Sequence, residues 1–321
     1  MSNNISVNEY FKRYQLLNPR MRSAKSIEAM AIDIKILNEF FREVHPDANR
    51  SVELGDLSAE LISGGAGWLV KKGRQPATAN RFIRHVAALW RFAAQDESVH
   101  HIIKPVTKLR KHKEPKRVPE AWAPDQFNSM VEVAGRLDGM VGEVPASIFW
   151  PCLLLTCYWT GVRISALMSL RVADVDLENC TIKFTAETQK HFADQVFYIP
   201  QDLVDLIKQL NPASRGHDLL FGDWPKDRTG VWGWKYLNQE FGRIAKKAGL
   251  ATGRRYKWHM VRRTVATQVC AAAGKSAAQS LLGHASASTT VRYLDPRFLK
   301  RVNPVDLIPK IHVPSQLKIV G

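Results

Sequence analysis

A basic, proline-containing segment about a third of the way along the chain most constrains its fold. Residues 104–119 have the sequence KPVTKLRKHKEPKRVP, with seven Lys or Arg residues, one acidic residue and three prolines. Proline disfavours regular secondary structure and like charges repel, so the segment predicts an extended basic linker. At roughly 150 residues per domain, 321 residues suit two domains that can each bury a core. We predict a domain over 1–110, the linker over 104–119, and a second domain over 118–321 with a C-terminal tail over 296–321.

The charge balance indicates a polyanionic partner. Lys and Arg number 46 against 30 Asp and Glu, which gives a formal net charge of +16. Nucleic acid and anionic membrane surfaces both attract such a chain. The longest apolar stretch, residues 148–159, contains Pro151 and is well short of the ~20 residues of a membrane span. The N-terminus shows no signal peptide, so we predict a cytoplasmic protein that binds nucleic acid.

Helical periodicity dominates the first domain. Apolar residues recur at three- and four-residue steps from Ile27 to Phe41, and a second helix capped by Thr78 follows the same pattern. Basic residues collect on one face of this second helix and continue in the linker. They are either a solvated surface or contacts to DNA phosphates, and we predict DNA binding. The residues concerned are Arg81, Arg84, Arg91, Lys108, Arg110, Lys111 and Lys113.

The second domain is predicted to be mainly α with a small antiparallel β-sheet. Strands are expected at 180–184 and 195–199, and helices at about 125–140, 146–170, 201–210, 235–248, 260–273, 276–282 and 287–294. Gly249 and Gly274 are expected to end helices, and Gly64–Gly67 in the first domain to form a loop that ends one. The four cysteines lack the spacing of a zinc or dithiol site, so no metal is predicted.

Two apparent motifs do not meet their requirements. Gly274-Lys275-Ser276 resembles the end of a phosphate-binding loop, but Val269 occupies the position of the required glycine. Asp174, Asp176 and Glu178 have the spacing of a calcium loop, but Asn179 replaces its glycine. A turn that enters a strand explains these carboxylates better.

Five separate segments together form a specific pattern. They are Thr160-Gly161-Val162-Arg163, Lys190 between the two expected strands, His259-Met260-Val261-Arg262, Leu282-Gly283-His284, and Tyr293. In order and spacing they resemble the fingerprint of the tyrosine recombinase or phage integrase family. This resemblance implies a two-domain clamp around DNA, in which a helical core-binding domain joins an α+β catalytic domain. It also implies a site-specific recombinase or integrase that needs no cofactor.

The residue types suit phosphoryl transfer. Attack on a phosphodiester builds negative charge that guanidinium donors such as Arg163 and Arg262 can offset. A phenol becomes a good nucleophile once its proton is removed or its anion is stabilised. The resemblance implies that Tyr293 forms a 3′-phosphotyrosyl link and that Lys190 protonates the leaving 5′-oxygen. It further implies that His259 assists proton transfer and that His284 hydrogen-bonds the phosphate. We expect Arg263 to support the fold or to contact the DNA backbone.

One position departs from the family pattern. An acidic residue is common three positions after the first arginine, where this chain has Ala166. Asp194 or Glu187 could supply the missing carboxylate.

The expected partners are double-stranded DNA and, on paired sites, three further copies of the chain in a homotetramer. Accessory DNA-bending proteins are compatible with this assembly. A topoisomerase of type IB and a non-catalytic DNA-binding protein of the same fold are the alternatives.

Overall fold

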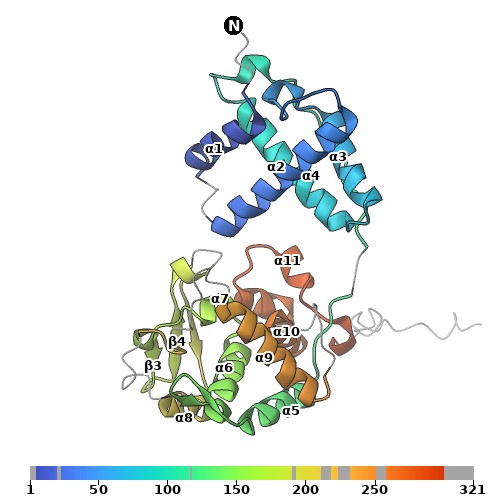
Figure 1. Ribbon diagram of the computed structural model, residues 1–321. Coiled ribbons are helices and arrows are strands. Elements are labelled where there is room, and N and C mark those ends of the chain that lie inside the picture. Colours follow the sequence, from blue (N-terminus) through green and yellow to red (C-terminus); the bar gives the residue numbers. More distant parts are fainter. Residues whose placement is uncertain are drawn as a thin grey trace, which may run out of the picture. The chain divides into compact units, whose positions relative to one another are not determined.

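The computed structural model describes residues 5–19, 23–115, 118–189, 193–210, 218–222, 232–250 and 258–299. The chain folds into two compact units, Met1–Lys116 and Arg117–Gly321, which are described separately below (Figure 1). The structure confirms the predicted class, because helices predominate in both units and the strands form small antiparallel sheets. Within these ranges, no helix has the length and apolar character that a membrane span requires.

The described part of unit 1 is a bundle of the helices α1 to α4 (Figure 1). They are α1 (Val7–Leu17), α2 (Ala24–Val44), α3 (Ala59–Lys71) and α4 (Pro76–Ala93). Each presents an apolar face to a shared core, in which Leu37, Phe82 and Trp90 are almost fully buried. Helix α4 begins at Pro76, with Gln75 as its N-cap, so the prediction that Thr78 caps it is wrong. Proline suits the first helical turn because the amide hydrogen that it lacks would have no helical partner there.

Gly64 and Gly65 lie inside α3, so the prediction of a loop at Gly64–Gly67 is wrong. A Cβ on Gly64 would lie 2.8 Å from Cζ of Phe40, and one on Gly65 would lie 2.9 Å from Cζ of Phe82. The two glycines therefore serve close packing against α2 and α4. This packing outweighs the low helix propensity of glycine, which is a local preference of about 1 kcal/mol.

The first part of the predicted linker, residues 104–115, is irregular in structure and packs on unit 1. Trp90 donates its indole N–H to the carbonyl of Lys104 at 3.1 Å. Asn80 accepts from the amide of His112 at 2.8 Å and donates to the carbonyl of His112 at 2.9 Å. The described part of this segment is therefore held on the surface of α4.

Unit 2 surrounds its core with helices, and its described ranges contain two small sheets. Its α-helices are α5 (Pro124–Gly135), α6 (Ala146–Thr160), α7 (Ile164–Leu167), α8 (Gln201–Gln209), α9 (Trp232–Lys247), α10 (Trp258–Leu282) and α11 (Ala287–Val291). One antiparallel sheet has the order β3 (Val175–Asp176), β4 (Thr181–Phe184), β5 (Gln195–Tyr198). A two-stranded hairpin of β1 (Met140–Val141) and β2 (Val144–Pro145) was not predicted. Asp176 accepts amide hydrogen bonds from Glu178 and Asn179, as expected for a turn that enters a strand.

Glycines with positive φ end or interrupt helices of unit 2. Gly161, with φ of 60°, ends α6, so the helix predicted over 146–170 is in fact two helices separated by Val162 and Arg163. Gly249 has φ of 72° and follows α9. Gly274 has φ of 85° and ψ of 174° and kinks α10, which confirms the predicted break between 260–273 and 276–282. Glycine is the residue that reaches positive φ at least cost, so these breaks are local properties of the sequence.

Candidate active site

Tyr293 lies just after α11, with its phenol ring close to two histidine rings. The ring centroids of His259 and His284 are 4.8 Å and 4.9 Å from that of Tyr293. The guanidinium carbon of Arg262 is 5.7 Å from the same ring centroid. His259 and Arg262 come from the first turns of α10, and His284 follows the end of that helix. The fold thus brings together four of the predicted site residues, which come from three separate segments.

Arg262 connects the turns that precede α7 and follow α10. Its guanidinium is almost fully buried and donates one hydrogen bond to the carbonyl of Gly161 and another, at 2.7 Å, to the carbonyl of Leu282. Burial and the nearby charge of Arg163 lower the pKa of Arg262 to about 10, and the group still carries its proton at neutral pH. Arg262 therefore holds the shape of the site in addition to supplying positive charge.

The hydrogen bonds of His284 define its neutral tautomer. Nη2 of Arg262 lies 3.4 Å from Nε2 of His284, and Oγ1 of Thr290 lies 3.1 Å from Nδ1. Guanidinium only donates, so Nε2 accepts, and Nδ1 then carries the proton and donates to Thr290. In this arrangement His284 orients Arg262. Donation from Nε2 to a phosphate, as the sequence predicts, requires protonation of the ring or the other tautomer.

Arginine N–H groups without partners mark the same region. Nη1 of Arg163, Nε of Arg262 and Nε of Arg263 are buried and have no hydrogen-bond partner among the described residues. Arg163 occupies the extended turn after Gly161, where it is the N-cap residue of α7. A buried donor without an acceptor is costly, so each such group calls for an explanation. An anion bound at this cluster would supply the missing acceptors.

His259 is neutral over the physiological pH range. Partial burial and neighbouring positive charges lower the pKa of its imidazole from 6.5 to about 4. These charges, in decreasing order of effect, belong to Arg263, Arg262 and Arg163. His259 is exposed to solvent, which leaves room for a substrate. A neutral imidazole beside a phenol has a free lone pair with which it can assist transfer of the phenolic proton.

These observations agree with comparisons to known proteins. The profile of the phage integrase family matches residues 123–299. The chain belongs to the phage integrase family.

Among its relatives, tyrosine recombinase XerC of Roseiflexus sp. (strain RS-1) is 26% identical over 94% of this chain and 93% of its own length. Proteins of Pseudomonas aeruginosa and Pseudomonas syringae that also carry the XerC name are 26% and 25% identical. The chain spans 59% and 49% of these two relatives.

Solved structures of recombinases have the same fold. XerH site-specific recombinase bound to difH substrate, in a post-cleavage complex, matches with a TM-score of 0.69 at 18% identity, over 88% of this chain and 78% of XerH. A lambda integrase tetramer bound to a Holliday junction matches with a TM-score of 0.63 at 16% identity, over 97% of this chain and 81% of the integrase chain.

Two positions bear on the departure from the integrase family pattern. Ala166 is 2% exposed and belongs to the core of unit 2, so a methyl group fills the position where a carboxylate is common. Asp194 pairs with Lys183 at 3.0 Å and accepts from the amide of Ala186 at 2.8 Å. Asp194 therefore supports the β4–β5 hairpin, and its carboxylate is committed there. Lys190, in the connection between these strands, lies outside the described residues.

Among the predicted DNA-binding residues, Arg81 differs from the rest. Its guanidinium forms two hydrogen bonds, at 2.9 Å and 3.1 Å, to the fully buried carboxylate of Asp33, which also contacts His85 at 2.6 Å. Arg81 therefore has a structural partner inside unit 1, although about a third of its side chain remains exposed. Asp33 has no sequence signal as a partner, because 48 residues separate it from Arg81.

The remaining predicted DNA-binding residues are exposed. They are Arg84 and Arg91 on α4 and Lys108, Arg110, Lys111 and Lys113 in the segment packed on it. A cavity of about 450 Å³ is lined by three of these cations, Lys108, Arg110 and Lys111. Ser63, Ile83 and His112 complete its lining. Exposed cations around a cavity form an electropositive surface that suits phosphate groups.

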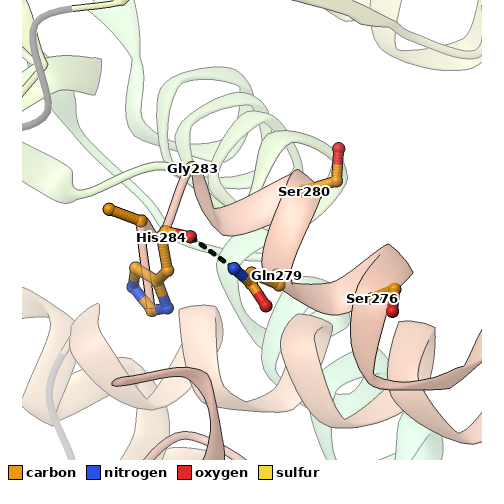
Figure 2. A pocket seen from close by; sticks show the side chains of 6 residues that line it. Ser276, Gln279, Ser280, Gly283 and His284 are labelled. Atoms are coloured by element: carbon orange, nitrogen blue, oxygen red, sulfur yellow. Dashed lines mark hydrogen bonds between the residues drawn. The ribbon is translucent and has the colours of Figure 1, made fainter. Parts of the chain in front are cut away.

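A second cavity, of about 530 Å³, adjoins the Leu282-Gly283-His284 turn. Figure 2 shows the side-chain amide of Gln279 reaching the main-chain carbonyl of His284, a hydrogen bond of 2.9 Å. The amide of His284 in turn donates to the carbonyl of Gln279 at 3.1 Å. Two hydrogen bonds thus fix the main chain of His284 after α10.

Three residues that support the site lie outside the motifs that the sequence singles out, namely Thr267, Thr290 and Asp295. Thr290 holds the His284 ring, and Thr267 and Asp295 hold the main chain around Tyr293. The position of Thr290, three residues before Tyr293, carried no recognisable signal. Asp295-Pro296 did carry one, since Asp followed by Pro is typical of the start of a helical turn, and Asp295 is the N-cap of one here.

Proposed function

We propose that the chain is a site-specific recombinase that cleaves and rejoins DNA through a 3′-phosphotyrosyl intermediate. The observation that carries the proposal is the position of the Tyr293 phenol, close to two histidines and beside an arginine cluster with buried N–H groups that have no acceptor among the described residues. A nucleophile next to unsatisfied donors is the arrangement that attack on an anionic phosphodiester requires.

In the proposed reaction, the phenol oxygen of Tyr293 attacks the scissile phosphorus while the 5′-oxygen leaves. Neutral His259 assists transfer of the phenolic proton to solvent, and Lys190 supplies a proton to the departing 5′-oxygen. Arg163 and Arg262 donate to the non-bridging oxygens, where charge accumulates in the transition state. The phosphotyrosyl ester conserves the energy of the broken bond, so attack by a free 5′-hydroxyl rejoins DNA and releases Tyr293.

The proposed partners follow from charge and from the relatives. The exposed cations of unit 1 would bind the phosphates of double-stranded DNA, with a strong dependence on salt. The lambda integrase structure is a tetramer on a Holliday junction, which supports a homotetramer on paired sites for this chain. We expect the protein to act in the cytoplasm. Relaxation of supercoiled plasmid without paired sites would instead support topoisomerase activity, because relaxation needs no second site.

The test of this proposal is covalent capture. On a nicked suicide substrate, the unaltered protein should leave a protein–DNA adduct on a denaturing gel, whereas Tyr293→Phe should leave none and bind DNA with normal affinity. Tyr158→Phe is the matched control, because it removes a phenol oxygen from a ring that stacks on Phe127 in the same unit. Adduct formation by Tyr293→Phe would contradict the proposed nucleophile.

A further inference from the structure

The main chain on both sides of Tyr293 is anchored, although the residue lies outside any helix. The amide of Tyr293 donates to the carbonyl of Thr290 at 2.8 Å, and its own carbonyl accepts from the hydroxyl of Thr267 at 3.3 Å. The next residue, Leu294, is buried in a small apolar cluster with Ala266 and other residues of α10. These contacts fix where the Tyr293 side chain starts, and so which positions its phenol oxygen can reach.

Asp295, two residues after Tyr293, is completely buried. Its carboxylate accepts from the amide of Ala121 at 2.8 Å and from the side chain of Arg297 at 2.6 Å. It also accepts from the amide of Arg297 at 2.9 Å. Burial favours the neutral acid, but these donors outweigh burial and hold the pKa of Asp295 below its ordinary value. The side chain is therefore an ionised acceptor at neutral pH.

Two threonines on α10 join the same framework. The amide of Asp295 donates to the hydroxyl of Thr267 at 3.0 Å, and one turn earlier the hydroxyl of Thr264 accepts from the amide of Trp122 at 3.0 Å. Both threonines are fully buried. The segments 121–122 and 293–295 are thus attached to the helix that carries His259 and Arg262. Distances between the phenol and these two side chains depend on that attachment.

We propose that Asp295 is a positioning residue for Tyr293, which it holds by tying the main chain after the nucleophile to α10 and to residues 121–122. The inference rests on the proposed function, since it assigns a partner to the proposed nucleophile. Asp295 acts through the main chain and through Thr267. Its loss should slow the chemical step while DNA binding is unchanged.

The first experiment separates cleavage from binding. In Asp295→Asn, one carboxylate oxygen becomes an NH₂ group that meets an N–H donor of Ala121 or Arg297, because both oxygens now accept hydrogen bonds. Single-turnover adduct formation should fall at least about tenfold, as expected for a misplaced reacting group. The dissociation constant for DNA should stay within about twofold. Asp174→Asn is the matched control, because Asp174 accepts an amide hydrogen bond from Arg171 in another turn of unit 2.

A second variant keeps the carboxylate. Thr267→Val has nearly the same shape but loses the hydroxyl that contacts Tyr293 and Asp295. It should also slow adduct formation without weakening DNA binding. The double variant that combines Thr267→Val with Asp295→Asn should lose a smaller factor in the rate of adduct formation than the product of the two single-variant factors. Both changes release the same main chain, so their effects overlap. A normal cleavage rate in either single variant would overturn the proposal.

A third experiment bypasses the phenol. In Tyr293→Phe, hydrogen peroxide can serve as an external nucleophile that attacks the scissile phosphorus and expels the 5′-oxygen. Adding Asp295→Asn to Tyr293→Phe should leave this cleavage unchanged, because Asp295 positions only the tyrosine. A further loss would show that Asp295 supports the arginine and histidine cluster itself, and the proposal would fail. The proposed function fails separately, if the unaltered protein forms no adduct.

Discussion

Replacing Arg262 with Ala tests whether this guanidinium supports the fold as well as the reaction. The change removes the donors to the carbonyls of Gly161 and Leu282. A buried acceptor left without a partner costs about 1–3 kcal/mol, so two of them cost roughly 2–6 kcal/mol. Burial and the charge of Arg163 disfavour the charged form of the Arg262 guanidinium, as its lowered pKa shows. Replacing Arg262 removes this unfavourable contribution, so the net loss in the free energy of unfolding should lie near the lower end of this range. At roughly 2–4 °C per kcal/mol for a unit of this size, the melting temperature should fall by about 4–12 °C.

Arg163→Ala provides the comparison. Nη1 of Arg163 has no acceptor among the described residues, and removing this charge relieves repulsion with Arg262. Its melting temperature should therefore equal or exceed that of the unaltered protein. Both variants should lose cleavage by about two to three orders of magnitude, as expected for a lost transition-state donor.

The assays are thermal unfolding followed by circular dichroism and single-turnover adduct formation on a suicide substrate. DNA affinity is measured in parallel, since an equal loss of affinity and cleavage would make either arginine an ordinary backbone contact. The proposed structural role of Arg262 is refuted if Arg262→Ala has the same melting temperature as the unaltered protein. It is also refuted if Arg163→Ala has a melting temperature as low as that of Arg262→Ala. In the first case the two carbonyl hydrogen bonds would contribute nothing to stability.

Two further predictions concern stability. Gly65→Ala should destabilise unit 1 by about 1–3 kcal/mol in urea unfolding, because its Cβ would lie 2.9 Å from the ring of Phe82. Gly67→Ala, which meets no described atom within 4 Å, should instead stabilise by up to about 1 kcal/mol, and equal effects would contradict the packing argument. The pKa of His259 is about 4 in the folded protein and 6.5 without the fold, so the unfolded chain takes up this proton at a higher pH than the folded protein does. His259 therefore makes the free energy of unfolding fall as pH drops from about 6.5 to about 4. His259→Gln should reduce that slope in unfolding measured at several pH values, and an unchanged slope would show that the imidazole is not held neutral.

The sequence by itself determined the features that depend on neighbouring residues along the chain. Gly249 and Gly274 were predicted to end helices, and both adopt positive φ there, because their backbone freedom is an intrinsic property. The apolar period from Ile27 to Phe41 predicted a helix that the structure shows as part of α2. The order and spacing of the motifs around Arg163, Arg262, His284 and Tyr293 indicated the family, since residue types are read directly from the chain.

Tertiary structure decided whatever depends on a partner far away in the sequence. Gly64 and Gly65 are helical because the rings of Phe40 and Phe82 pack against them, which outweighs the local preference of glycine for a loop. Arg81 was predicted to contact DNA from its place on a basic helical face, but only the fold brings the buried Asp33 to it. Asp295 likewise gained its role because Ala121, 174 residues earlier, lies within hydrogen-bond distance. Contacts of this kind form when distant segments share a buried space, and burial makes an unpaired polar group costly enough to select its partner.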